Sequence, residues 1–96
     1  MKIDVIFAVE DPGAANFVLD MPEELNKIKL SSAILTFGNA PKFLTNKGIQ
    51  NFNCSKIKNV DEIFERFSFK VLVAGTSQNS NSIILKLIKE CRFNSI

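Results

Sequence analysis

The chain alternates short apolar runs with segments of helical periodicity. The runs at 3–9, 32–37 and 69–74 are rich in β-branched residues and contain at most one charge each. Such runs are typical of strands buried on both faces of a parallel sheet. A weaker run at 49–54 alternates without a clean apolar face, so we expect a short edge strand there.

Four helices are expected between and after these strands. Over 14–28, Phe17, Met21, Leu25 and Ile28 form one apolar stripe, and Pro22 should kink or split this helix near Val18. Shorter helices are expected over 41–47, with Gly48 as the cap that follows, and over 60–67. The last is expected over 83–92, with its buried face formed by Ile84, Leu87, Ile88 and Cys91.

The resulting order, βαβαβαβα, predicts a three-layer α/β/α sandwich. We expect a Rossmann-like, mostly parallel sheet of about four strands in the order 3-2-1-4, forming a single domain over 1–96. Residues 93–96 resemble the first residues of a further strand. The sequence therefore predicts a partial domain, cut off before strand five.

The amino-acid composition limits the kinds of catalysis, metal binding and partner that the chain can support. The 96 residues carry a formal net charge of +2, no histidine and two cysteines. Without histidine, the commonest general base and the commonest metal ligand are missing. The spacing of the two cysteines matches no zinc site, so we expect both to be buried thiols. We therefore expect no bound metal and no cofactor. Lysine and arginine form no cluster, which argues against a nucleic-acid partner. No apolar run is long enough for a transmembrane segment or a secretory leader, which predicts a cytoplasmic protein.

Candidate site residues follow the predicted strands. In a sheet of order 3-2-1-4, ligands bind at the carboxyl ends of the first and fourth strands. Glu10 and Asp11 follow the first strand and are candidate catalytic acids or bases, although one could instead cap the first helix. The candidate substrate-binding residues are Gly13, Ala14, Asn16, Gly38, Gly75, Thr76, Ser77 and Asn79.

Simpler interpretations of the loops stay open. Each glycine could serve only a tight turn, and the hydroxyl and amide side chains after Gly75 could be helix caps. Neither loop satisfies the dinucleotide fingerprint or the P-loop motif.

Two segments make the sequence similar to a known family. Residues 9–16, VEDPGAAN, and 74–82, AGTSQNSNS, followed by LKLI at 85–88, resemble the amino-terminal Rossmann-like domain of GT-B-type proteins. These are the glycosyltransferases and UDP-N-acetylglucosamine 2-epimerase-like proteins of bacterial surface-polysaccharide synthesis. The resemblance implies that the loops around Gly13 and Gly75 face an acceptor or reacting sugar across a cleft. It also implies that a second domain supplies most sugar-nucleotide contacts and that this chain is inactive alone.

Two other classes remain open. A receiver-type signalling module would also place acids such as Glu10 and Asp11 after its first strand and Thr76 after its fourth. However, Cys54 and Ser55 stand where its phosphorylated aspartate is expected, and no fifth strand precedes its lysine. The third class is a non-catalytic, oligomerising α/β module. An exposed sheet edge or apolar face favours self-association, so we expect a homo-oligomer.

Overall fold

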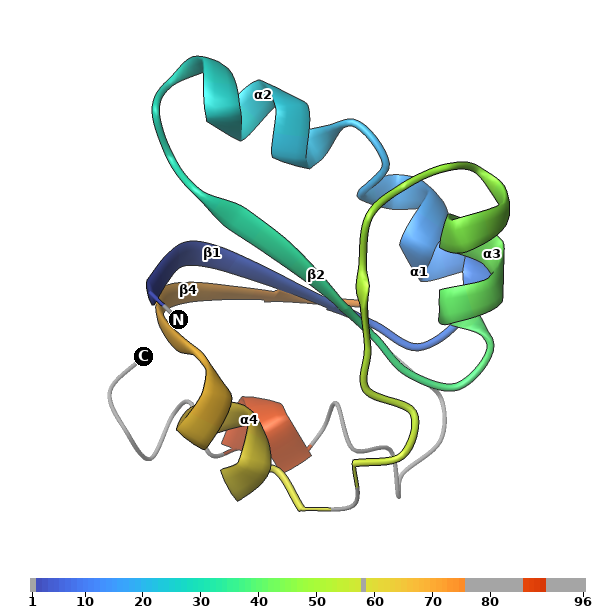
Figure 1. The fold of residues 1–96 in the computed structure, drawn as a ribbon, viewed down its shortest axis with the longest axis vertical. Helices are drawn as coiled ribbons and strands as arrows, with labels where there is room; N and C mark the ends of the chain where they lie inside the picture. The colour runs from blue at the N-terminus through green and yellow to red at the C-terminus, as the bar shows by residue number, and fades with distance from the viewer. Residues whose placement is uncertain (1, 58, 76–85, 90–96) are drawn as a thin grey trace.

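Strands and helices alternate along the protein in the expected order (Figure 1). The computed structural model describes residues 2–57, 59–75 and 86–89. Its elements are β1 (Lys2–Val9), α1 (Pro12–Phe17), α2 (Met21–Lys27), β2 (Ser32–Thr36), α3 (Ala40–Asn46), β3 (Phe52–Asn53), α4 (Asp61–Arg66) and β4 (Ser68–Ala74). Residues 86–89 are also helical. The remainder of the helix expected over 83–92 lies outside the described residues.

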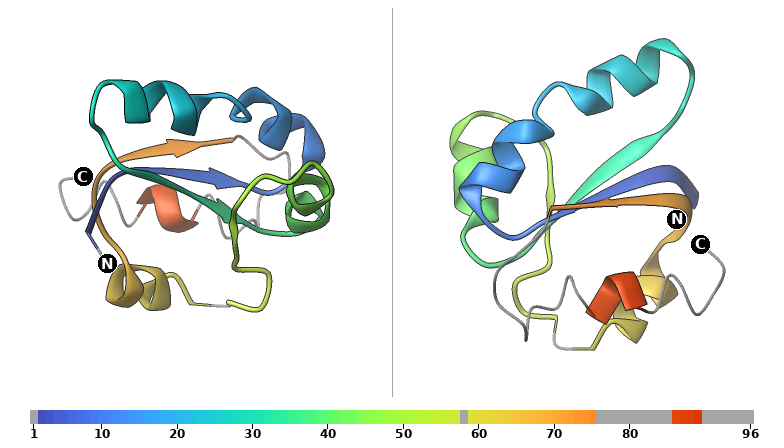
Figure 2. Two further views of the ribbon diagram at one scale, coloured as in Figure 1. Left: turned by 45° about the horizontal axis from the view of Figure 1, so that its top comes forward. Right: turned by 180° about the vertical axis from the view of Figure 1, so that it is seen from behind.

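The four strands form one parallel sheet in the order β3-β2-β1-β4. This confirms the predicted α/β class and strand order. The helices lie on both sides of the sheet: α2 covers one face, and α4 with residues 86–89 covers the other (Figure 2). The central strand is β1, which pairs with β2 on one side and with β4 on the other.

The core consists of two apolar clusters separated by the sheet. On the α4 face, Ile6 and Leu35 pack with Ile63 and Leu87. On the opposite face, the cluster contains Phe7 and its neighbours Val5, Val9, Ala15, Val18, Ile34, Ala40 and Leu44. Both clusters depend on β1, whose last four residues are fully buried. The prediction that this strand is buried on both faces is therefore confirmed.

The first predicted helix is split at the expected place. α1 ends at Phe17 and α2 begins at Met21, with Pro22 in its first turn, where a missing N–H removes no helical hydrogen bond. The single apolar stripe predicted over 14–28 is wrong in part, because Met21 is 41% and Ile28 65% exposed. Once the helix is broken, α2 has its own axis and the residues on either side of the break no longer share one face.

The third strand is shorter than the predicted 49–54 and contains only Phe52 and Asn53. Side-chain contacts hold the segment that enters this strand against β2. The hydroxyl of Thr36, which is fully buried, lies 2.9 Å from Asn51 Oδ1 and 3.1 Å from the carbonyl oxygen of Phe52. These contacts attach the start of β3 and the residue before it to β2. The prediction of a short edge strand is confirmed.

Among the described residues, no helix covers one face of β4. Val71 and Val73 pair in register with Val5 and Phe7, so they lie on the face that carries α1, α2 and α3. They are 49% and 36% exposed, whereas Val5 and Phe7 are buried. The prediction of a sheet covered on both faces is therefore wrong at β4 among the described residues.

Both cysteines are predicted to be buried thiols, and the structure confirms this for Cys54. It is 3% exposed and forms no disulfide. Burial raises the pKa of the Cys54 thiol, and the positive charge of Arg66 opposes this only in part. Cys54 is thus kept in its uncharged form in the core, while Cys91 lies outside the described residues.

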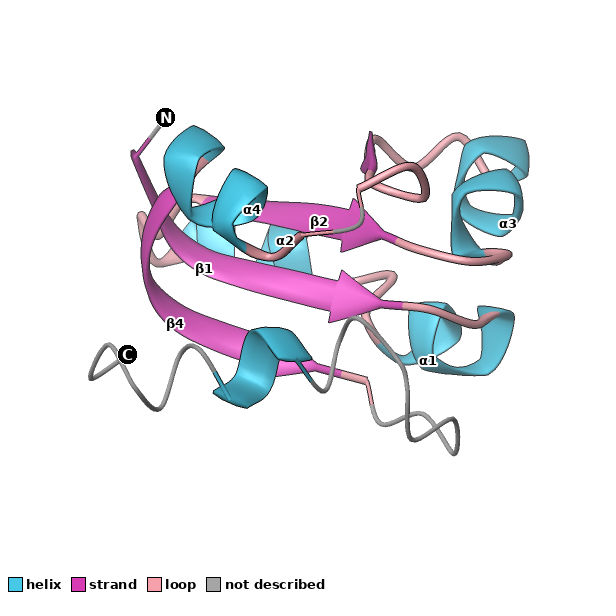
Figure 3. Ribbon diagram, turned by 90° about the horizontal axis from the view of Figure 1, so that it is seen from below, coloured by secondary structure: helices cyan, strands magenta, loops and turns pink. Residues whose placement is uncertain are grey.

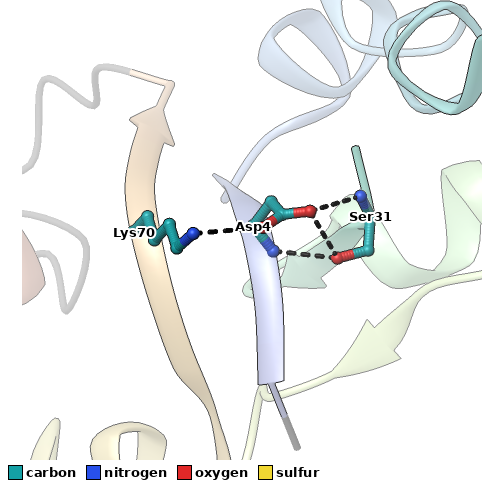
Figure 4. A network of polar contacts seen from close by, with 3 residues as sticks. All are labelled: Asp4, Ser31 and Lys70. Atoms are coloured by element: carbon teal, nitrogen blue, oxygen red, sulfur yellow. Dashed lines mark hydrogen bonds and ion pairs between the residues drawn. The ribbon is translucent and has the colours of Figure 1, made fainter. Parts of the chain in front are cut away.

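Asp4 connects three segments at the amino-terminal end of the sheet (Figure 4). Its carboxylate accepts hydrogen bonds from the Ser31 backbone N–H at 2.8 Å and the Ser31 hydroxyl at 3.1 Å. The backbone N–H of Asp4 donates to Ser31 Oγ at 2.9 Å, and Lys70 Nζ lies 4.0 Å from the carboxylate. Asp4 therefore ties β1 to the residue before β2 and to β4.

Acid is expected to weaken this connection. The Ser31 backbone N–H and then its hydroxyl hold the pKa of Asp4 below its ordinary value. Burial opposes them in part, and the charge of Lys70, which also lowers this pKa, has the smallest effect. Because the folded-state pKa is depressed, the stabilisation is complete above the unfolded-state pKa and is lost as pH falls through the folded-state pKa. The free energy of unfolding, measured with a denaturant from about pH 7 to about pH 3, shows this loss of stability.

The Asp4→Asn variant should show a smaller loss of stability over that pH range than the wild-type protein. Glu24→Gln is the control, since Glu24 makes only an exposed ion pair with Lys27. Identical pH dependence in Asp4→Asn and the wild-type protein would contradict the role assigned to Asp4.

Candidate functional site

The loops after β1, β2 and β4 begin side by side at the carboxyl edge of the sheet. The N–H of Phe37 donates to the carbonyl oxygen of Val9 at 2.9 Å, and the N–H of Gly75 donates to that of Ala8 at 2.9 Å. These bonds flank the end of β1, where Glu10 follows. α1 and α3 lie beyond the same edge, in contact with each other (Figure 3).

Gly38 brings the loop after β2 against the loop after β1. Its φ of +56° lies in the left-handed region that favours glycine. A Cβ at Gly38 would lie 2.8 Å from the backbone oxygen of Glu10 and 3.2 Å from Glu10 Cγ. Such a close approach leaves room only for a hydrogen atom. The sequence placed Gly38 among the candidate residues but carried no signal for its contact with Glu10.

The two candidate catalytic carboxylates differ in exposure. Glu10 is half-buried beside Gly38, and Asp11 is exposed. The carbonyl oxygen of Asp11 accepts the N–H of Ala15 at 3.0 Å, the first hydrogen bond that enters α1. A carboxylate in the position of Glu10 can accept hydrogen bonds from ligand hydroxyl groups or exchange a proton with a ligand.

Gly13 lies inside α1, where its φ is not positive. The open alternative, in which Gly13 serves a left-handed turn, is therefore wrong. A Cβ at Gly13 would instead lie 3.2 Å from Asp11 Oδ1, so the missing side chain leaves space for that carboxylate. Ala14 is in the same helix, and Asn16 is exposed on it.

The remaining candidates fall into two groups. Gly75 is placed next to β1 by its hydrogen bond to Ala8. Thr76, Ser77 and Asn79 lie outside the described residues. The structure thus brings Glu10, Gly38 and Gly75 to one edge of the sheet through backbone contacts.

Metal-ligand clusters and membrane-spanning helices are both absent from the described residues. Within ranges 2–57, 59–75 and 86–89, no group of three or more histidine, cysteine, aspartate or glutamate side chains could hold a metal ion. In that part of the chain, no helix has the length and apolar character needed to cross a bilayer.

These features define an α/β protein with a Rossmann-like parallel sheet in the order 3-2-1-4. Comparison of the chain with protein-family models, with curated proteins and with solved structures gives no match. Its class therefore stands on the fold, and any activity has to be argued from the loops at the carboxyl edge.

Proposed function

We propose that this chain forms the amino-terminal domain of a sugar-nucleotide-dependent glycosyltransferase or epimerase-like protein of surface-polysaccharide synthesis. The observation that carries the proposal is the convergence of three loops at the end of β1, through Gly38 against Glu10 and Gly75 against Ala8. In open parallel sheets, the crevice beside the central strand is the usual place for a ligand. The resemblance of residues 9–16 and 74–82 to GT-B-type proteins supports a sugar as that ligand.

The proposed roles follow the positions of the residues. Glu10 and Asp11 would contact the reacting hydroxyl groups as acid, base or hydrogen-bond acceptor. The candidate residues in α1 and after β2 and β4 would line the sugar-binding side of the cleft. The nucleotide would lie mainly on a second domain facing this edge, so the chain alone would bind sugar nucleotides weakly and turn none over.

Hydrogen–deuterium exchange on the full-length protein tests this proposal. Saturating UDP-N-acetylglucosamine or UDP-glucose is expected to slow exchange in the segments around Glu10, Gly38 and Gly75. The Glu10→Gln variant should lose activity while keeping the exchange pattern of the unliganded protein. Glu65→Gln is a matched control, because Glu65 is exposed on α4, away from the carboxyl edge. Unchanged exchange at all three segments with both ligands would refute a sugar-nucleotide site here.

A second candidate role, self-association, is favoured by the exposed valines of β4. Val71 and Val73 form an apolar face, and among the described residues no strand pairs with the outer edge of β4. A long edge strand with apolar side chains is prone to pairing with another chain. We expect a second copy of this chain to cover the face.

Light scattering at increasing protein concentration measures this association. The wild-type chain is expected to form a dimer or a larger assembly, and Val71→Asp to shift it towards the monomer. Ile28→Asp is the control, because it introduces the same charge at an exposed apolar residue directly after α2. A monomeric mass for the wild-type chain at high concentration would exclude the self-association.

A further inference from the structure

A polar groove lies at the carboxyl edge beside β3, next to the proposed sugar-nucleotide crevice, with which it shares only Gly38. It has a volume of about 380 Å³ and borders Gly38. Its polar lining comes from α3 and the residues around it and from the segment that ends β3: Asn39, Lys42, Thr45, Asn46, Asn53 and Ser55. The crevice between β1 and β4 is displaced from this groove by one strand along the edge.

The side chains that line the groove are hydrogen-bonding groups and one cation. It contains three amide groups, two hydroxyl groups and one ammonium group, and none of its residues carries a carboxylate. Amides and hydroxyls both donate and accept hydrogen bonds, which matches the hydroxyl groups of a sugar. The ammonium group of Lys42 adds attraction for a phosphate or a carboxylate. The groove therefore suits a small molecule that combines hydroxyl groups with a negative charge.

Hydrogen bonds hold the two walls of the groove in place. Asn51 Oδ1 accepts a hydrogen bond from the Thr36 hydroxyl at 2.9 Å. Asn51 Nδ2 in turn donates to Thr45 Oγ1 at 3.4 Å. On the opposite wall, Asn53 Oδ1 accepts the N–H of Ser55 at 3.0 Å. The buried Thr36 is thus connected to α3 through Asn51 and to the start of β3 through Phe52. A site whose walls are already fixed loses less conformational entropy on binding.

Several lining groups are available to a ligand. The Asn39 side chain makes no capping hydrogen bond to α3. Lys42 and Asn46 are exposed, as are Asn53 and Ser55. These exposed side chains are accessible to a ligand, and the Asn53 oxygen that accepts the Ser55 N–H has a second lone pair.

We propose that this groove is a binding site for a hydroxylated anion, such as a sugar phosphate or a sugar carboxylate. Lys42 provides the charge, while the asparagine, threonine and serine side chains contact the hydroxyl groups. The inference goes beyond the proposed function, since the groove can bind such a molecule whether or not the β1–β4 crevice binds a sugar nucleotide.

NMR titration of the chain with glucose 1-phosphate and with glucuronate tests the inference and identifies the source of the anion. Saturable shifts of the Asn39, Lys42 and Asn53 amides are expected with at least one of the two, with affinity of order 1 mM. Glucose alone and inorganic phosphate alone should bind at least about fivefold more weakly. The amides of Glu10 and Gly75 report the crevice separately, so a failure of either site is seen independently.

Matched variants on α3 decide whether Lys42 acts specifically. Lys42→Gln is expected to weaken binding by roughly fivefold, the effect of one exposed ionic contact. Lys47→Gln removes the same charge from the residue that follows α3, where the ammonium lies over the Phe43 ring, and should leave binding unchanged. Absence of saturation with both probes, equal binding of phosphate alone, or equal weakening by the two variants would each overturn the proposal.

Discussion

Replacing Phe7 with alanine is expected to lower the free energy of unfolding by about 3–5 kcal/mol. Phe7 is fully buried in the central strand and packs in the cluster formed by α1, α3 and β2. Truncation removes the burial of the ring and leaves a cavity that backbone hydrogen bonds on both sides of β1 prevent from closing. Since domains of this kind are stable by about 5–15 kcal/mol, a large unfolded population is expected.

Urea or guanidinium unfolding measures this effect, and circular dichroism shows whether the variant still folds. Phe43→Ala is the matched control, because Phe43 is only partly buried on α3 and should cost clearly less. If Phe7→Ala were no less stable than Phe43→Ala, β1 would not be the centre of the core.

Gly38→Ala is expected to cost about 2–4 kcal/mol, through two additive effects. The φ of +56° is strained for alanine, which contributes about 1–2 kcal/mol. The new Cβ would also lie 2.8 Å from the Glu10 backbone oxygen, so one of the two loops has to move. Because the obstruction is backbone rather than a flexible side chain, the movement displaces Glu10 and should weaken any ligand bound there.

Gly48→Ala separates these two effects. Gly48 also has a positive φ, +72°, but a Cβ there meets nothing within 4 Å. It should therefore show only the backbone strain, about 1–2 kcal/mol. Equal losses of stability in the two variants, measured by denaturant unfolding, would mean that the loops after β1 and β2 are not in close contact.

Local pattern was enough to predict most of the fold. The β-branched runs predicted β1 and β2, and the alternation of strands and helices predicted the order 3-2-1-4. Pro22 marked the break between α1 and α2, and Gly48 follows α3 with the left-handed φ expected of a helix cap. The strands, the break and the cap are each determined by residues that are close in the sequence, whereas the strand order was expected from the fold class that the alternation indicates.

Features that depend on distant residues could not be predicted in the same way. Val71 and Val73 have the same side chains as the buried valines of β1, and only their place at the edge of the sheet makes them exposed. The hydrogen bond between Thr36 and Asn51, next to the short strand β3, joins residues that are 15 positions apart in the sequence. At the candidate site, the approach of Gly38 to Glu10 likewise joins two loops, and no local pattern contains it.

The register of β1 has a consequence for how the protein folds. Lys2 pairs with Ser68 and Ala8 with Ala74, so β1 is synthesised well before β4, the strand with which it pairs on one side. Contacts between such distant residues form slowly, because the loop entropy is lost before the contacts can compensate for it. Until β4 is synthesised, β1 has an open edge, and the nascent chain has to be protected there from pairing with other chains.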